Sequence, residues 1–486
     1  MASILTAGMQ SAGTASAREA SSPGAPFWAA AACLLSGAML PALVYWASRG
    51  EAFEWIWSFP GQRDSARFVA LGLASVFVLA LLVSARVARR WGHGAAPSRA
   101  TRLWKAAGAA LLVACVGALL VRWPHRGAPG DALTWLNLAA DPELMPDSPL
   151  GRASHYLFYQ VVSQSSVDRW FRPGPKMLAL RFSAVAAGMF YLTVLLMWAR
   201  RAFPRSSAWT SVVFLFVTPT LVLYAGYLET TPWAYAFTGA YLLAGLRYLN
   251  TGLRRPPWPE ALLLMLAVGS HGVMCFVTGA HALLCLHWFF AREPGEHTPW
   301  SAQRVAQVIG VGLLPFTVLV AAFVWTYHFG SIGNRYWYGN ALGGPDKDFW
   351  VAYSDAAIKP GHRAWFKEYV FGSREYLTGL LNVLLFACPL LFALPAAIWH
   401  TLCSQRRPAL FLLAGFAGLF LITLFFNPDL GYRSDFDLLA VFAVPASMLI
   451  ALWWDARFSS RQRWLLALSI AAASFVFLVT PNLRFP

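Results

Sequence analysis

Apolar segments of about 18 or more residues recur along almost the whole chain. A segment of this length and composition is long enough to cross the hydrocarbon core of a bilayer as a helix. Inside lipid, a helix satisfies its backbone hydrogen bonds internally, which an open strand or a loop cannot do. The pattern therefore predicts an all-α fold, a polytopic integral membrane helical bundle.

The apolar segments predict about thirteen transmembrane helices. They are Phe27–Ser48, Ala66–Arg86, Trp104–Val121, Leu178–Ala199, Ala208–Tyr224, Pro232–Leu249, Pro259–Cys275, Thr278–Ala291, Val305–Tyr327, Gly379–Trp399, Ala409–Phe426, Phe436–Trp454 and Trp464–Thr480. Residues 1–26, rich in Ala, Ser and Gly, are predicted to form a disordered cytoplasmic tail. Residues 27–486 are predicted to form a single transmembrane domain.

Composition argues against a soluble protein, because 58% of the 486 residues are hydrophobic and only 12% are charged. The net charge of +16 does not indicate a nucleic-acid partner, since the basic residues lie in short loops between apolar segments. The cysteines lack the spacing of metal ligands.

Arginine clusters occur in alternate loops, and positive charge resists translocation across a membrane. The clusters are Arg89/Arg90/Arg99/Arg102, Arg200/Arg201/Arg205, Arg254/Arg255, Arg406/Arg407 and Arg457/Arg461/Arg463. All of these loops are predicted to be cytoplasmic. Two long loops, Trp123–Met177 and His328–Thr378, then lie on the extracytoplasmic side, and their many aromatic residues beside Arg and Lys are typical of interfacial helices.

The first long loop contains Asp131, which follows a predicted span closely. Its carboxylate is placed either to act as a general base at the mouth of the bundle or simply to be solvated in the loop. Asp141, Glu143 and Asp147 lie among prolines, where carboxylates more often cap turns. His155 is predicted to be a structural histidine.

Glu229 lies in a connection so short that its carboxylate must stay at the membrane boundary. A charge there is costly unless it is paired or hydrated, which is typical of a site; the alternative is an N-cap of the helix that starts at Pro232. His271 lies near the outer end of its span and has the same two interpretations.

The connection before the span Phe436–Trp454 contains Arg433, Asp435 and Asp437. Arg433 is suited to bind a phosphate or to pair with one of these acids. Asp435 and Asp437 have a spacing that suits a divalent metal, and equally the start of a helix. Because topology places these residues on the same face as Asp131, Glu229 and His271, we expect one substrate site assembled from several connections.

Three of these segments resemble the GT-C superfamily of polytopic glycosyltransferases. Gly130-Asp131 is similar to the catalytic position in their first large outer loop, and Gly226-Tyr227-Leu228-Glu229 to a Tyr-x-Glu connection of bacterial members. Asn427–Leu438 is similar to an Asn-Pro-x-Leu-Gly-x-x-x-Asp-Trp-Asp-Leu element, with Phe436 in place of Trp. The resemblance covers residues 104–486 as a GT-C-like core, with residues 27–86 as an extra N-terminal hairpin.

The resemblance implies transfer of a sugar from a polyprenyl-phosphate donor to a glycan, lipid or protein acceptor, on the outer face of a bacterial inner membrane. Asp131 would be the catalytic base, and Glu229, His271, Asp435 and Asp437 would contact substrate. Arg433, with Arg335 and Lys347 from the second long loop, would stabilise the leaving phosphate. Some members use a divalent metal and others none, so both remain open.

Other functions remain open at this stage. A multi-span transporter or flippase also has many spans and acids near the membrane, although its usual paired halves with broken helices are not evident. An envelope polysaccharide ligase or polymerase would also use lipid-linked glycans. A non-catalytic scaffold would leave the outer acids without a role.

Overall fold

Helices form wherever the structure describes an apolar segment, in agreement with the all-α prediction. The structure is a computed structural model that describes residues 132–165, 174–206, 208–216, 224, 229–252, 255–291, 301–329, 369–388, 390–426, 436–460, 462–464 and 466–467. Within these ranges there is no β-strand, only single bridge residues at Val370 and Phe426. The predicted tail, the extra hairpin and the spans 104–121 and 468–480 lie outside them.

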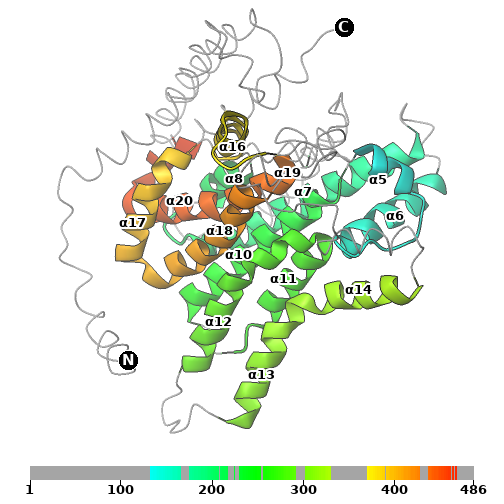
Figure 1. Cartoon of the computed structure of the whole chain (residues 1–486). Helices are drawn as coiled ribbons and strands as arrows, with labels where there is room; N and C mark the ends of the chain where they lie inside the picture. The colour runs from blue at the N-terminus through cyan, green and yellow to red at the C-terminus, as the bar shows by residue number, and fades with distance from the viewer. Residues whose placement is uncertain are drawn as a thin grey trace, which may run out of the picture.

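The described helices run through the chain in the following order (Figure 1). They are α5 Ala132–Leu138, α6 Pro149–Ser163, α7 Pro175–Ala202, α8 Ala208–Phe216, α10 Thr231–Thr251, α11 Trp258–Ser270, η4 Gly272–Val277, α12 Thr278–Phe290, α13 Ala302–Leu313, η5 Leu314–Phe316, α14 Thr317–Phe329, α16 Arg374–Ala387, η8 Leu391–Ala393, α17 Leu394–Ser404, α18 Arg406–Phe425, α19 Phe436–Leu439, η9 Ala440–Phe442 and α20 Ala443–Arg457.

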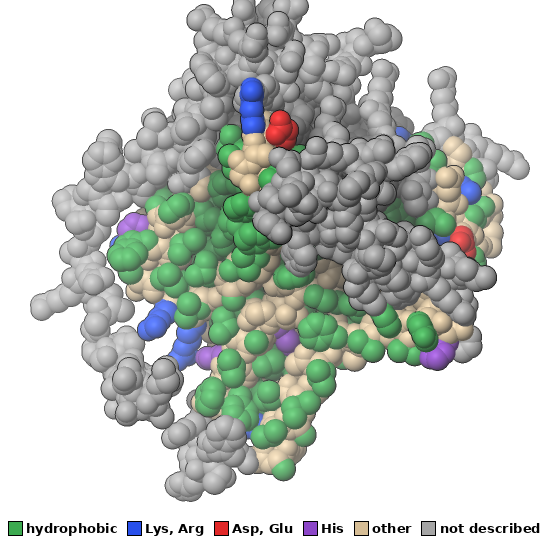
Figure 2. Space-filling view, viewed as in Figure 1, with side chains coloured by type: hydrophobic (Ala, Val, Ile, Leu, Met, Phe, Trp, Pro, Cys, Tyr) green, Lys and Arg blue, Asp and Glu red, His purple; other side chains and the backbone are tan. Residues whose placement is uncertain are grey.

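Five described segments are long and apolar enough to cross a membrane. They are Pro175–Ala202, Gly272–Phe290, Ala302–His328, Arg406–Phe425 and Ala440–Arg457. Their outer faces carry large exposed apolar side chains, such as Phe290, Ile309 and Trp325. Green apolar atoms cover much of the described surface in Figure 2. Such a surface requires lipid around it, and the chain is an integral membrane protein.

Helix α10 lies at the centre of the bundle and contacts α7, α11, α18 and α20. Most of its side chains are buried, among them Tyr235 and Tyr241. Small residues allow this close packing: an added Cβ on Gly239 would overlap the ring of Tyr191, and one on Gly245 would overlap the ring of Phe411. Glycine is therefore required where aromatic rings from α7 and α18 press against α10.

Four predicted spans are interrupted in the structure, and one of them, Phe436–Trp454, divides into α19, η9 and α20. Pro259–Cys275 was expected to be one helix, but α11 ends at Ser270 and His271 caps a separate 3₁₀ turn. Gly379–Trp399 divides into α16 and α17. Helix α16 ends at Ala387 because Pro389 disfavours helical geometry at the residue before it, Cys388. Val305–Tyr327 changes direction at the turn that contains Pro315, so that α13 and α14 point in clearly different directions (Figure 1).

The arginine-bearing segments meet at one end of the bundle, which we call the Arg-rich end. It comprises the last turns of α7, α10, α12, α17 and α20 and the first turns of α11, α13 and α18. Arg255 pairs with Glu260 at 2.9 Å where α10 leads into α11, and Arg304 of α13 donates to the carbonyl of Trp288 in α12 at 2.8 Å. The described members of the predicted clusters thus lie at one end of the structure, whereas Arg89, Arg90, Arg99, Arg102, Arg254 and Arg461 lie outside the described residues.

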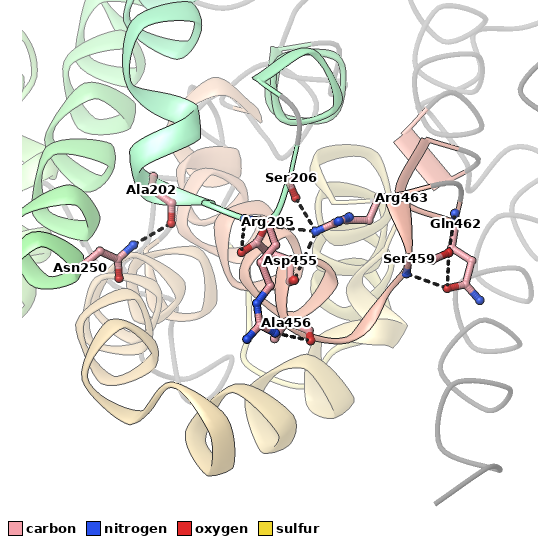
Figure 3. A network of polar contacts seen from close by, with 9 residues as sticks. All are labelled: Ala202, Arg205, Ser206, Asn250, Asp455, Ala456, Ser459, Gln462 and Arg463. Atoms are coloured by element: carbon pink, nitrogen blue, oxygen red, sulfur yellow. Dashed lines mark hydrogen bonds and ion pairs between the residues drawn. The ribbon is translucent and has the colours of Figure 1, made fainter. Parts of the chain in front are cut away.

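A buried ion pair closes the Arg-rich end between α7 and α20 (Figure 3). Asp455 is only 2% exposed, and its Oδ1 accepts a hydrogen bond from Arg463 Nη1 at 3.2 Å. The same Nη1 donates to Ser206 Oγ at 3.3 Å, and the backbone N–H of Arg205 donates to Asp455 Oδ2 at 3.3 Å. A buried acid with this set of donors holds both helix ends in register.

Candidate functional site

The structure describes some of the predicted site residues and not others. Glu229 and His271 are described with their side chains, and the backbone of Asp437 lies in the short helix α19. The other predicted site residues lie outside the described ranges: Asp131, Arg335, Lys347, Arg433 and Asp435. What can be built is therefore the part of the site around Glu229 and His271, at the end of the bundle opposite the Arg-rich end.

Glu229 is buried, with 8% of its surface exposed, just ahead of α10. The N-cap of α10 is Thr230, so Glu229 lies one residue before the cap. The alternative in which Glu229 caps the helix directly is therefore not what the structure shows. Its carboxylate remains close to the positive end of the α10 dipole, which favours a negative charge there.

His271 has the capping role that the sequence left open. It is the N-cap of η4, and its Nδ1 accepts a hydrogen bond from the backbone N–H of Val273 at 3.3 Å. The next residue, Gly272, donates its backbone N–H to the carbonyl of Asp147 at 2.6 Å. The His271 turn is thus joined to the loop between α5 and α6.

Of the acids in the α5–α6 loop, Asp141 caps a turn as predicted, and Asp147 makes a local side-chain hydrogen bond. Asp141 Oδ1 accepts the backbone N–H of Glu143 at 2.9 Å, and Asp147 Oδ1 accepts the hydroxyl of Ser148 at 3.2 Å. Their local hydrogen bonds account for their positions without a catalytic role.

Arg152, in the first turn of α6, is a residue that the sequence interpretation missed. Its side chain is buried, at 1% exposure, and donates from Nε to the carbonyl of Glu143 at 3.2 Å and from Nη2 to the carbonyl of Asp141. An arginine three residues before a histidine, at the start of a segment expected to return to the membrane, is the signal that could have identified it.

His155 is completely buried one turn further along α6. Its Nε2 donates to the backbone carbonyl of Glu229 at 3.1 Å, and the ring of Trp135 packs edge-on against it with centroids 5.8 Å apart. Burial, and then the nearby Arg152, lower the pKa of His155 to about 3. The imidazole is therefore neutral and cannot bind a phosphate as a cation, so the prediction of a structural histidine is confirmed.

A second polar chain joins α6 to the helices behind it. Trp233 Nε1 of α10 donates to Ser183 Oγ of α7 at 3.0 Å, and Ser183 Oγ lies 3.1 Å from Ser154 Oγ of α6. These hydrogen bonds fix the orientation of α6 on the bundle.

Metal ligands do not gather within the described ranges: there, no three side chains of His, Cys, Asp or Glu come close enough to hold an ion. The pair Asp435 and Asp437, the predicted alternative, falls outside the described side chains.

Comparison with known proteins gives one structural likeness to report. No family model and no curated protein matches the chain. The fold is similar to that of ArnT from Cupriavidus metallidurans, whose crystal structure is bound to undecaprenyl phosphate. The TM-score is 0.43 and the sequence identity 16%, over 72% of this chain and 61% of the ArnT chain, less than two thirds of that chain's length. At this score the likeness does not by itself assign a family or a reaction.

Proposed function

We propose that this chain is a membrane glycosyltransferase of the GT-C type, which moves a sugar from a polyprenyl-phosphate donor to an acceptor hydroxyl on the extracytoplasmic side of a bacterial inner membrane. The observation that carries the proposal is the meeting of the Glu229 connection, the His271 turn and the α5–α6 loop at the first turns of α6, at the end opposite the Arg-rich end.

The proposed reaction is an inverting displacement. The acceptor hydroxyl attacks the anomeric carbon while the bond from that carbon to the phosphate oxygen breaks, and the hydroxyl proton passes to Asp131. Polyprenyl phosphate leaves, and Arg433, Arg335 and Lys347 stabilise its charge. Glu229, His271, Asp435 and Asp437 contact the substrates. A divalent metal at Asp435 and Asp437 is compatible with this scheme and not required by it.

The test is donor consumption by purified protein in lipid-supplemented detergent. Wild type and Asp131→Asn are incubated with a panel of radiolabelled undecaprenyl-phosphate hexoses and pentoses, with envelope extract as acceptor. We expect transfer by wild type and a loss of about 100-fold or more in Asp131→Asn, because the base is removed. Glu375→Gln is the matched control, since Glu375 is an exposed acid in the first turn of α16 and should transfer like wild type.

Two results would overturn the proposal. Full activity of Asp131→Asn would remove this residue from the mechanism. If folded wild type consumed no donor, yet moved a lipid-linked sugar across the membrane of sealed vesicles, the chain would be a flippase and not a transferase.

A further inference from the structure

The first two turns of α6 contact three segments that are far apart in the sequence. Arg152 holds the 141–143 loop by two backbone carbonyls, and His155 holds the backbone carbonyl of Glu229. Gly151 lies against the third segment: an added Cβ there would lie 2.8 Å from the carbonyl oxygen of Ser270 and 2.6 Å from Cβ of Thr230. α6 therefore approaches both α10 and α11 as closely as a backbone can.

These contacts go to main-chain atoms and not to the candidate catalytic side chains. A hydrogen bond to a carbonyl fixes where a segment runs and leaves its side chain available for substrate. The loop held by Arg152 is joined to Asp131 through α5, and the carbonyl held by His155 belongs to Glu229 itself. The same helix thus fixes the 141–143 loop relative to the Glu229 connection.

The protonation state of His155 suits this role. Because Nε2 donates to a carbonyl, the ring is the tautomer with its proton on that nitrogen. Nδ1 then has only a lone pair to offer, and it is buried without a hydrogen-bond partner among the described residues. An anion would be repelled at such an atom. Arg152 is only 1% exposed and donates from Nε and Nη2 to two carbonyls, while its Nη1 is buried without a hydrogen-bond partner among the described residues.

We propose that Gly151, Arg152 and His155 form a positioning brace, which holds the 141–143 loop and the Glu229 connection at the separation that sugar transfer requires. The inference rests on the proposed function. Arg152 and His155 are positioning residues: they contact the backbone of the site and not the substrate. Loss of the brace should lower kcat much more than it changes KM for the donor, since displacement of a reacting group by about 1 Å can cost about 100-fold in rate.

The experiment uses two amide substitutions that differ in reach. In His155→Gln the side-chain NH₂ extends to about the position of Nε2 and can still donate to the Glu229 carbonyl, whereas in His155→Asn it reaches only as far as Nδ1. We expect kcat to fall by about 10- to 100-fold in His155→Asn and to stay within about threefold of wild type in His155→Gln, with KM for the undecaprenyl-phosphate sugar within about twofold in both.

Hydrogen–deuterium exchange on the full-length protein tests the brace without the reaction. In His155→Asn, exchange should rise in the peptide that contains residues 229–231, and in Arg152→Lys it should rise in the peptide that contains residues 139–147. The rest of the bundle should exchange like wild type. These changes are expected even if no tested donor is consumed, so failure of the brace and failure of the proposed function can be told apart.

Equal kcat values for His155→Gln and His155→Asn would overturn the brace. An increase in exchange over the whole bundle in Arg152→Lys would also overturn it, because it would show that Arg152 supports global stability and not the placement of one loop.

Discussion

His155 illustrates how burial sets the charge of a single side chain. The ring is surrounded by α6, Trp135 and the Glu229 connection, and its pKa is lowered to about 3 from an ordinary value of 6.5. Between these two values the folded protein keeps the ring neutral, whereas an unfolded chain would take up a proton. Protonation therefore favours the unfolded state as the pH falls below 6.5.

We expect this residue alone to lower the free energy of unfolding by about 1.4 kcal/mol for each pH unit below 6.5. Stability from the neutral ring is fully present above pH 6.5 and is lost progressively towards pH 3. The measurement compares denaturant unfolding of wild type and His155→Gln at about pH 7.5 and about pH 5, where the difference between the two proteins should change by about 2 kcal/mol in favour of Gln. A difference that does not depend on pH would contradict the assigned charge state.

At the residue scale, the sequence predicts the position of Glu229 because a carboxylate in a very short connection between two spans must stay near the ends of those helices. The role of His271 could not be chosen, since capping of a 3₁₀ turn requires the break between α11 and η4 to be known. Arg152 was missed because its partners are backbone carbonyls of a loop, and such contacts depend on the path of the chain.

At the element scale, long uninterrupted apolar runs predicted their helices well. The span Leu178–Ala199 corresponds to α7 and Pro232–Leu249 to α10, each with bounds only a few residues wider. The spans that divide into two helices have a different property, because their sequence stays apolar through the break. The helix ends are set instead by local backbone geometry, at the His271 cap and at the residue before Pro389.

Close packing between α18 and η4 gives a test of two matched glycines. An added Cβ on Gly418 would overlap the backbone carbonyl of Phe276, whereas nothing lies within 4 Å of one on Gly312 in α13. We expect Gly418→Ala to lower the free energy of unfolding by about 1–3 kcal/mol, because the two backbones must separate. Gly312→Ala should be neutral or more stable by up to about 1 kcal/mol, because alanine favours a helix.

Thermal unfolding of both variants in the same detergent provides the comparison. A similar change in stability at both positions would contradict the prediction, because it would show that the contact with Phe276 does not determine the effect of Gly418→Ala.

At the scale of the whole molecule, the bundle has two chemically different ends. The Arg-rich end contains Arg205, Arg255, Arg407 and Arg457, and Figure 2 shows blue Lys or Arg side chains beside purple His near α12 and α18. The opposite end carries Glu229 and α6. By the distribution of positive charge we infer that the Arg-rich end faces the cytoplasm.

Cys403 is a natural reporter for this orientation, because it is a free, exposed thiol at the Arg-rich end of α17. In a variant that lacks the other cysteines, a membrane-impermeant maleimide should label Cys403 in inverted vesicles and not in intact spheroplasts. Glu375→Cys, introduced into a protein without native cysteines, should show the reverse pattern, since Glu375 lies at the opposite end. Labelling of Cys403 from outside the cell would invert the proposed topology and place the candidate site in the cytoplasm.

The ion pair of Asp455 also has a consequence for the order of biogenesis. Arg205, just after the end of α7, donates its backbone N–H to Asp455 and precedes it by 250 residues, whereas Arg463 follows Asp455 by only 8. The connection after α7 is therefore synthesised long before α20, whereas Asp455 and Arg463 are made almost together. An unpaired carboxylate at a membrane boundary is costly, and this close spacing supplies Asp455 with its cationic partner as α20 inserts. We expect the contact between Asp455 and the connection after α7 to form only once both segments are in the membrane, so that it joins the early and late halves of the chain at a late step of assembly.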